Sequence, residues 1–226
     1  MPAAADRSPE QERARFRAGM RDGVPYALAG MLVAVSYGVL AKPVLGSAAP
    51  IVMSAVVFAG SAQFASLAVL AAGGGAATAI AAGLLLNLRF LPMGIAVAPS
   101  MVHGALGRAA RGQALVDASW ALSNRGGGRF DISALLGATA VQYVTWNLGT
   151  VLGVLAGGVL GDPSRIGLDA VYPAFFLGLL VTELRRPGAR LISLTGATIA
   201  LALTPVLPAG VPILAAAAAA TLGLRS

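Results

Sequence analysis

The sequence predicts an all-α integral membrane protein with about six to seven transmembrane or re-entrant helical segments, at least one of them broken. Composition is the first reason, because 57% of the 226 residues are hydrophobic and only 11% are charged. A soluble domain carries about 25% charged residues. The second reason is arrangement: the apolar residues form long runs, and arginines gather in the polar gaps between them.

The apolar runs approach the roughly 20 residues that a helix needs to cross a bilayer. They cover residues 24–44, 49–71, 76–98, 132–160, 168–184, 191–207 and 208–224. We expect residues 1–23 to form a cytoplasmic N-terminal arm, because they are polar and lack the apolar core of a signal peptide. Residues 24–226 are expected to form a single transmembrane transport domain, with a polar cytoplasmic interval at about 101–131.

Charge predicts the topology and also raises a difficulty. The net charge of +7 comes from 16 Lys and Arg against 9 Asp and Glu. The basic residues follow the positive-inside rule and are not collected on one solvated face, so nucleic-acid binding is not indicated. The rule places both the N-terminal arm and the interval 101–131 inside, yet three apolar runs lie between them. Three crossings would leave the arm and the interval on opposite sides of the membrane. If one of the three runs is broken or re-entrant and does not cross, both segments can lie inside. Such a run requires that protein or a water-filled cavity receives its backbone polar groups.

The sequence offers little for catalysis, cofactors or metals. Cysteine is absent, which excludes disulfides and thiolate sites. The lone histidine, His103, lies beside a loop glycine, and no phosphate-binding loop or Ser/His/Asp set is apparent. We therefore expect neither an enzyme nor a cofactor or metal site.

The centre of the second run is polar, although it would lie near the middle of the hydrocarbon core. Gly60, Ser61 and Gln63 lie within "FAGSAQF". Glycine weakens a helix by about 1 kcal/mol relative to alanine, and unwound backbone in transporters often binds substrate near the midplane. One interpretation is that these residues supply unwound backbone and an amide to a substrate. The other is that the small residues allow close packing while Gln63 bonds a neighbouring helix.

The third run carries an arginine deep among apolar residues. Arg89 lies roughly 14 Å from Ala98 at helical rise, which is costly unless a partner or a cavity receives the charge. Pro92 cannot donate to the carbonyl of Leu88, so a kink is expected beside Asn87 and Arg89. The arginine fork suits a substrate carboxylate, and we favour that role for Asn87 and Arg89. A structural ion pair is the alternative.

The fourth run combines polar residues with a glycine stripe. Trp146 and Asn147 are candidates for the border of a substrate cavity, although an interfacial aromatic with polar neighbours explains them equally well. Glycines then recur every four residues, which predicts close packing against another helix, in this chain or in a partner. These are Gly149, Gly153, Gly157 and Gly161.

Several of these stretches resemble the AzlC family, the large subunits of branched-chain amino acid exporters. The resemblance spans roughly residues 16–224, and its most specific parts are "FAGSAQF" and "NLRFLP". "DGVPYALAGMLVAVSYGVLA", Asp117 in "LVDASWAL", and Trp146 with Gly149 and Thr150 also match. The chain departs from the family where Ala118 follows Asp117, since an acidic residue is common there.

The resemblance implies a multi-pass permease in the cytoplasmic membrane of a bacterium. It implies export of hydrophobic, branched-chain amino acids and a small AzlD-type membrane subunit as partner. The predicted substrate site comprises Gly60, Ser61, Gln63, Asn87, Arg89, Trp146 and Asn147. The alternatives are a membrane scaffold or sensor subunit, transport of another small substrate, and uptake instead of export.

Overall fold

The computed structural model describes residues 8–101, 104–157, 170, 174, 177, 180, 181, 184, 189–207 and 211–217. Within these residues every element is helical, apart from an isolated antiparallel bridge between Asn124 and Phe130. The predicted all-α class is therefore confirmed for this part of the chain. Two helical segments there are long and apolar enough to cross a membrane, Pro9–Leu45 and Ala76–Ser100. The count of about six to seven segments stays a prediction.

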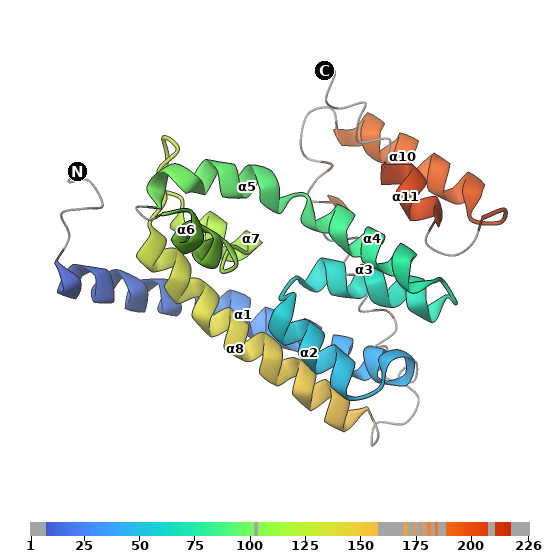
Figure 1. Ribbon diagram of the computed structural model, residues 1–226, viewed down its shortest axis with the longest axis horizontal. Helices are drawn as coiled ribbons and strands as arrows, with labels where there is room; N and C mark the ends of the chain where they lie inside the picture. The colour runs from blue at the N-terminus through green and yellow to red at the C-terminus, as the bar shows by residue number, and fades with distance from the viewer. Residues whose placement is uncertain are drawn as a thin grey trace. The chain divides into compact units, whose positions relative to one another are not determined.

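The helices follow one another along the chain without strands between the described elements (Figure 1). They are α1 (Pro9–Leu45), α2 (Ala48–Val56), α3 (Gly60–Ala71), α4 (Ala76–Asn87), α5 (Phe90–Val97), the 3₁₀ turn η2 (Ala98–Ser100), α6 (Ala105–Gly112), α7 (Asp117–Ser123), α8 (Ile132–Ala156), α10 (Ala189–Leu203) and α11 (Val211–Ala217). Most of the predicted run 168–184 lies outside the described residues, as do His103 and Gly161.

The chain divides into two compact units. The first unit comprises Met1–Val35 and Leu88–Leu152, and the second comprises Ser36–Asn87 and Gly153–Ser226. Helices α1 and α8 each pass from the first unit into the second. The single transport domain expected from the sequence stays a prediction.

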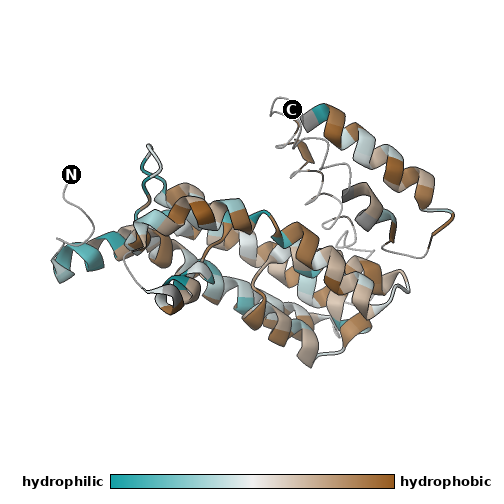
Figure 2. Cartoon of the chain, turned by 45° about the horizontal axis from the view of Figure 1, so that its top comes forward, coloured by the Kyte–Doolittle hydropathy of each residue, from teal (hydrophilic) through white to brown (hydrophobic). Residues whose placement is uncertain are grey.

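Residues 9–23 of the predicted N-terminal arm form the beginning of α1. α1 has 37 residues, which corresponds to roughly 55 Å of helix. The hydrocarbon core of a bilayer is only about 30 Å thick. The first turns of α1 contain Glu10 and Glu12 and are hydrophilic in Figure 2. A bilayer that holds the apolar part of α1 therefore leaves the polar part outside its core.

In the first unit, α1 and α8 lie side by side and run in the same direction (Figure 1). Gly19 of α1 faces Ala134 near the start of α8, and Gly149 farther along α8 faces Met31 of α1. Residue numbers therefore rise together along the two helices. Glycine at such contacts lets two backbones approach closely. Both helices consequently begin at the same end of the first unit.

The glycine stripe of the fourth run packs against α1 of the same chain. A Cβ at Gly149 would lie 2.7 Å from the carbonyl oxygen of Met31, and in the second unit a Cβ at Gly157 would lie 3.5 Å from Val39. Gly153, between them, is buried. The described part of the stripe is thus used within the chain.

The described residues of the polar interval 101–131 include two helices and pack against α5 and α8. The backbone N–H of Phe130 donates to the hydroxyl of Ser100 at 3.1 Å, which brings the two ends of the interval together. Leu115 and Phe130 join a buried cluster with residues that flank the interval. The other buried members of this cluster are Val97, Met101 and Leu135. Trp120 of α7 packs against the same cluster, so apolar packing fixes α7 against α5 and α8.

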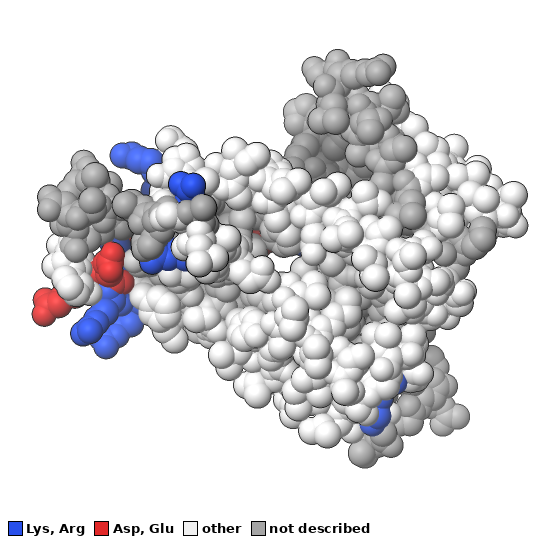
Figure 3. All heavy atoms as spheres, in the orientation of Figure 1, with Lys and Arg blue, Asp and Glu red and all other residues white. Residues whose placement is uncertain are grey.

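The buried carboxylate of Asp131 links the start of α1 to the start of α8 through polar contacts. Asp131 is 1% exposed and lies 2.5 Å from Arg15 and 3.6 Å from Arg125. It also accepts a hydrogen bond from the backbone N–H of Ala134, in the first turn of α8. Figure 3 shows that charged side chains gather near the beginning of α1, while most of the described surface in that view is uncharged.

The close approach of α1 and α8 predicts opposite outcomes for two glycines of the first unit. A Cβ at Gly137 would collide with the carbonyl oxygen of Phe16, whereas a Cβ at Gly94 of α5 would meet nothing within 4 Å. Gly137→Ala should lower the unfolding free energy by about 1–3 kcal/mol through overpacking. Gly94→Ala should leave it unchanged or raise it by up to about 1 kcal/mol through helix propensity. Denaturant unfolding of the purified protein in detergent measures both, and equal effects would contradict this packing.

Candidate functional site

The second apolar run is interrupted in the second unit, so the prediction of a broken segment is confirmed. α2 ends at Val56 and α3 begins at Gly60. Between them Phe58 has a φ of 44°, and Ala59 is extended with φ −139° and ψ 90°. The ideal helical path therefore stops for three residues in the middle of the run.

The position of this interruption corrects the sequence prediction. Gly60, Ser61 and Gln63 were expected to supply unwound backbone, but they form the first turn of α3. The unwound residues are Val57, Phe58 and Ala59. A helix commonly ends with a glycine in the left-handed conformation. Here Phe58 adopts that conformation, so the glycine at position 60 was a misleading guide to the break.

Polar side chains around the interruption are buried and paired with one another. The amide of Gln63 donates to the hydroxyl of Ser54 at 2.8 Å, which joins α3 to α2 across the break. Gln63 also hydrogen bonds to Tyr37 of α1, and the Tyr37 hydroxyl donates to the sulfur of Met53 at 3.2 Å. Gln63 and Ser54 are fully buried. Buried polar groups require such partners, so this network stabilises the broken geometry.

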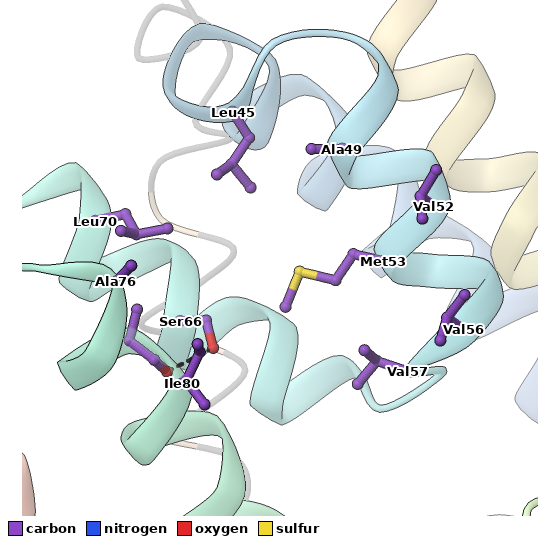
Figure 4. Close-up of a pocket in the computed structure, with 11 residues that line it drawn as sticks. Leu45, Ala49, Val52, Met53, Val56, Val57, Ser66, Leu70, Ala76 and Ile80 are labelled. Carbon is purple, nitrogen blue, oxygen red and sulfur yellow. Dashed lines mark hydrogen bonds between the residues drawn. The ribbon is translucent and has the colours of Figure 1, made fainter.

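An apolar cavity of about 410 Å³ lies between α2 and the α3–α4 pair of the second unit. Figure 4 shows the side chain of Met53 pointing into it and the hydroxyl of Ser66 bonded to the carbonyl oxygen of Ala79, at 2.8 Å. The lining residues are Leu45, Ala49, Val52, Met53, Val56, Val57, Ser66, Leu70, Ala76, Ala79 and Ile80. Almost every one is apolar, so the cavity suits an aliphatic group.

The structure brings Asn87 to the end of the hairpin where α3 begins. α3 and α4 lie side by side and antiparallel (Figure 1), since Ser66 contacts Ala79 while Gly83 lies beside Ala62. Asn87 follows Gly83 by one helical turn. Its Oδ1 is buried and has no hydrogen-bond donor among the described residues. Gly60, Ser61, Gln63 and Asn87 therefore share one end of this hairpin.

The third apolar run is also interrupted, at the predicted kink. α4 ends at Asn87 and α5 begins at Phe90. The backbone N–H of Leu91 donates to the carbonyl oxygen of Leu88 at 3.0 Å, which is a tight turn of the kind that a following proline favours. Arg89 occupies this turn.

Arg89 forms an ion pair that sequence analysis offered only as the alternative. Its Nη2 lies 2.8 Å from a carboxylate oxygen of Asp117, at the start of α7 in the same unit. The guanidinium carbon also lies 5.1 Å from the ring centre of Phe90. Side-chain exposure is 33% for Arg89 and 58% for Asp117. A substrate role for Arg89 must therefore include Asp117.

Asp117 reaches Arg89 because the polar interval folds back along α5. Arg89 precedes Ser100, where the interval begins, by roughly 16 Å of helix. The hydroxyl of Thr139 on α8 donates to the carbonyl oxygen of Ala114 at 2.6 Å, and Leu115 is buried. These contacts hold the chain just before Asp117. The sequence places Asp117 within the polar cytoplasmic interval, and its match to the family motif was the signal available.

Trp146 and Asn147 lie in the middle of α8, in the first unit. Trp146 packs beside Gly30 of α1. The amide of Asn147 donates to the carbonyl oxygen of Tyr143 in its own helix at 2.9 Å. Their predicted role at a cavity border stays a prediction. Among the described residues, no three His, Asp or Glu side chains are grouped to hold a metal ion.

These features define a helical membrane protein whose apolar segments are interrupted by polar residues, which is a common architecture of transport proteins. The sequence model of the family described as AzlC protein matches residues 25–160. The chain belongs to the AzlC family, which confirms the resemblance carried by its motifs. Membership and apolar helices together indicate a membrane protein with a transport-related function. Searches of curated proteins and of solved structures find no match to the chain.

Because Phe58 is left-handed, we expect glycine to stabilise the protein more than alanine does at this position, which is the reverse of the order found inside a helix. Phe58→Gly and Phe58→Ala remove the same ring, but only glycine adopts positive φ without strain. The glycine variant should therefore be about 1 kcal/mol more stable than the alanine variant. In the interior of α3, Ala68→Gly should instead cost about 1 kcal/mol. Thermal unfolding in detergent compares the three, and an alanine variant of Phe58 as stable as the glycine variant would exclude the left-handed turn.

Proposed function

We propose that this chain is a subunit of a secondary transporter that exports hydrophobic, branched-chain amino acids across the cytoplasmic membrane. The observation that carries the proposal is the interruption of an apolar run at Val57–Ala59 beside the buried pair Ser54–Gln63. Broken helices in membranes expose backbone groups that bind substrates. Family membership supports transport. The proposed partner is a small AzlD-type membrane subunit.

The apolar cavity of the second unit supports a hydrophobic substrate, and Arg89 of the first unit separately supports a substrate that carries a carboxylate. The cavity of about 410 Å³ beside the α2–α3 break is within the usual size range for small-molecule pockets and is apolar, as a branched side chain requires. Arg89 offers a planar fork of the kind that binds carboxylates. We therefore propose Gln63 and Arg89 as the residues whose loss most reduces transport, with Gly60, Ser61, Asn87, Trp146 and Asn147 in supporting roles.

The parallel course of α1 and α8 supports a specific membrane topology. Because both helices begin at the same end of the first unit, the chain between their starts crosses a membrane an even number of times. α1 and the segment Ala76–Ser100 are each long enough to cross. α2 has 9 residues and α3 has 12, roughly 14 and 18 Å of helix. We infer that α2 and α3 enter and leave on the same side as a re-entrant pair, with the N-terminus cytoplasmic.

Single cysteines test this topology directly, since the chain has none of its own. Ser47→Cys precedes α2, Gly75→Cys follows α3, and Ala14→Cys lies in the polar part of α1. In intact cells a membrane-impermeant maleimide should label positions 47 and 75 but not position 14. In permeabilised cells all three should react. Labelling of 47 and 75 from opposite sides would mean that α2 and α3 together cross the membrane.

Export from dipeptide-loaded cells tests the function. Cells that hydrolyse a valine- or isoleucine-containing dipeptide should release the amino acid at least several-fold faster when the chain and its candidate small partner are expressed together than when either is expressed alone. Gln63→Ala and Arg89→Ala should abolish most of this gain at equal amounts of protein in the membrane. Retained export in both variants would refute these residues as the site.

The same assay separates the transporter from a scaffold or sensor subunit. A scaffold could use the glycine stripe to bind a partner, but Gly149 and Gly157 of the stripe pack against α1 of the same chain. If both proteins reach the membrane and release of valine and isoleucine is unchanged, this substrate assignment is wrong. Efflux of another loaded solute would then favour a different transported substrate, and no efflux of any would favour the scaffold.

A further inference from the structure

We propose that Arg89 and Asp117 together recognise the two charges of a zwitterionic α-amino acid by exchanging partners with it. The substrate's α-carboxylate takes the place of Asp117 on Arg89, and its α-ammonium takes the place of Arg89 on Asp117. Asp117 is then a specificity-determining residue in addition to Arg89. This inference rests on the proposed function and identifies the part of the substrate that the pair selects.

The two charges are held in place but remain reachable. The turn between α4 and α5 and the nearby ring of Phe90 position the guanidinium of Arg89. The buried Leu115 fixes the chain that leads into Asp117. The Arg89–Asp117 separation is 2.8 Å, yet the Asp117 side chain is 58% exposed. A ligand can therefore approach the carboxylate without unfolding its surroundings.

Asp131, a second carboxylate in the same unit, is an enclosed structural site and can be compared with Asp117. Asp131 is 1% exposed, lies near both Arg15 and Arg125, and caps the first turn of α8. The groups that pair with its carboxylate are two arginines and a backbone N–H of the same chain. Asp117 has no such enclosure, since its side chain is more than half exposed. The contrast assigns a fastening role to Asp131 and a ligand-binding role to the Arg89–Asp117 pair.

The energetics favour a ligand that carries both charges. Arg89 lies within the segment Ala76–Ser100, which is long and apolar enough to cross a membrane. An unpaired charge in such a segment is costly. Without substrate, the two side chains satisfy each other. A zwitterion gives each of them an opposite charge again, whereas an acid without an amine leaves Asp117 unpaired and an amine without an acid leaves Arg89 unpaired.

Trp120 supplies a further group on the same face of α7. It follows Asp117 by three residues, so the two side chains are neighbours on the helix surface. Its Nε1–H is buried and has no acceptor among the described residues. The ring packs on Phe130 in the buried cluster of the first unit, with 5.4 Å between ring centres, and so holds α7 in place beside Asp117.

Competition in proteoliposomes tests the exchange. The full-length chain is reconstituted with its candidate small partner and transports labelled valine. Unlabelled valine is compared with valinol, which lacks the carboxylate, and with 2-hydroxyisovalerate, which lacks the amine. The wild type should prefer valine over each analogue by about tenfold or more, since one charged hydrogen-bonding partner is lost in each case. Arg125→Gln, which alters an arginine near Asp131, should keep both preferences.

The variants should lose these preferences selectively. Measured on the valine transport that each variant retains, Asp117→Asn should bring 2-hydroxyisovalerate within about threefold of valine while valinol remains poor, and Arg89→Gln should do the reverse. Asp117→Glu, which keeps the charge, should restore discrimination if the asparagine variant folds poorly. The charge-reversed pair Arg89→Asp with Asp117→Arg should remain folded but transport valine poorly. Wild-type preferences in all of these variants, with valine still transported, would overturn the exchange alone. Absence of valine transport by the wild type would overturn the proposed function itself.

Discussion

The parallel contact between α1 and α8 is the constraint on which the rest of the first unit depends. Glycines on both helices let the backbones approach until carbonyl oxygens occupy the space that side chains would need. The buried Asp131 fastens the same two helices at their beginnings through Arg15. Since the helices begin together, the chain between them starts and ends at the same end of the first unit.

Each interruption is stabilised by a different kind of polar pairing. At the α2–α3 break, neutral groups of Ser54 and Gln63 satisfy each other in a fully buried site. At the α4–α5 turn, the opposite charges of Arg89 and Asp117 meet in a partly exposed site. Neutral hydrogen bonds in an apolar surrounding maintain a fixed geometry at low cost. A charged pair that a ligand can reach is suited to being exchanged.

The folded polar interval makes the second kind of site possible. The interval carries four arginines, which is typical of a solvated connection. Its residues Leu115, Trp120 and Phe130 nevertheless pack against α5 and α8, and Trp120 belongs to α7. The interval therefore returns along α5 until Asp117 stands opposite Arg89. The charge that makes Arg89 tolerable in an apolar run comes from a segment more than twenty residues farther along the chain.

The sequence by itself determined the helical membrane class, the family and the presence of polar interruptions in the second and third runs, because apolar run length, glycine, proline and arginine act locally. The kink beside Arg89 follows from Pro92 in this way. Tertiary structure decided the remainder. The left-handed residue of the α2–α3 break is Phe58 and not a glycine, since packing can impose a conformation that local preference disfavours. The pairings Gln63–Ser54, Arg89–Asp117 and Asp131–Arg15 depend on which segments meet in space, and no local pattern specifies that.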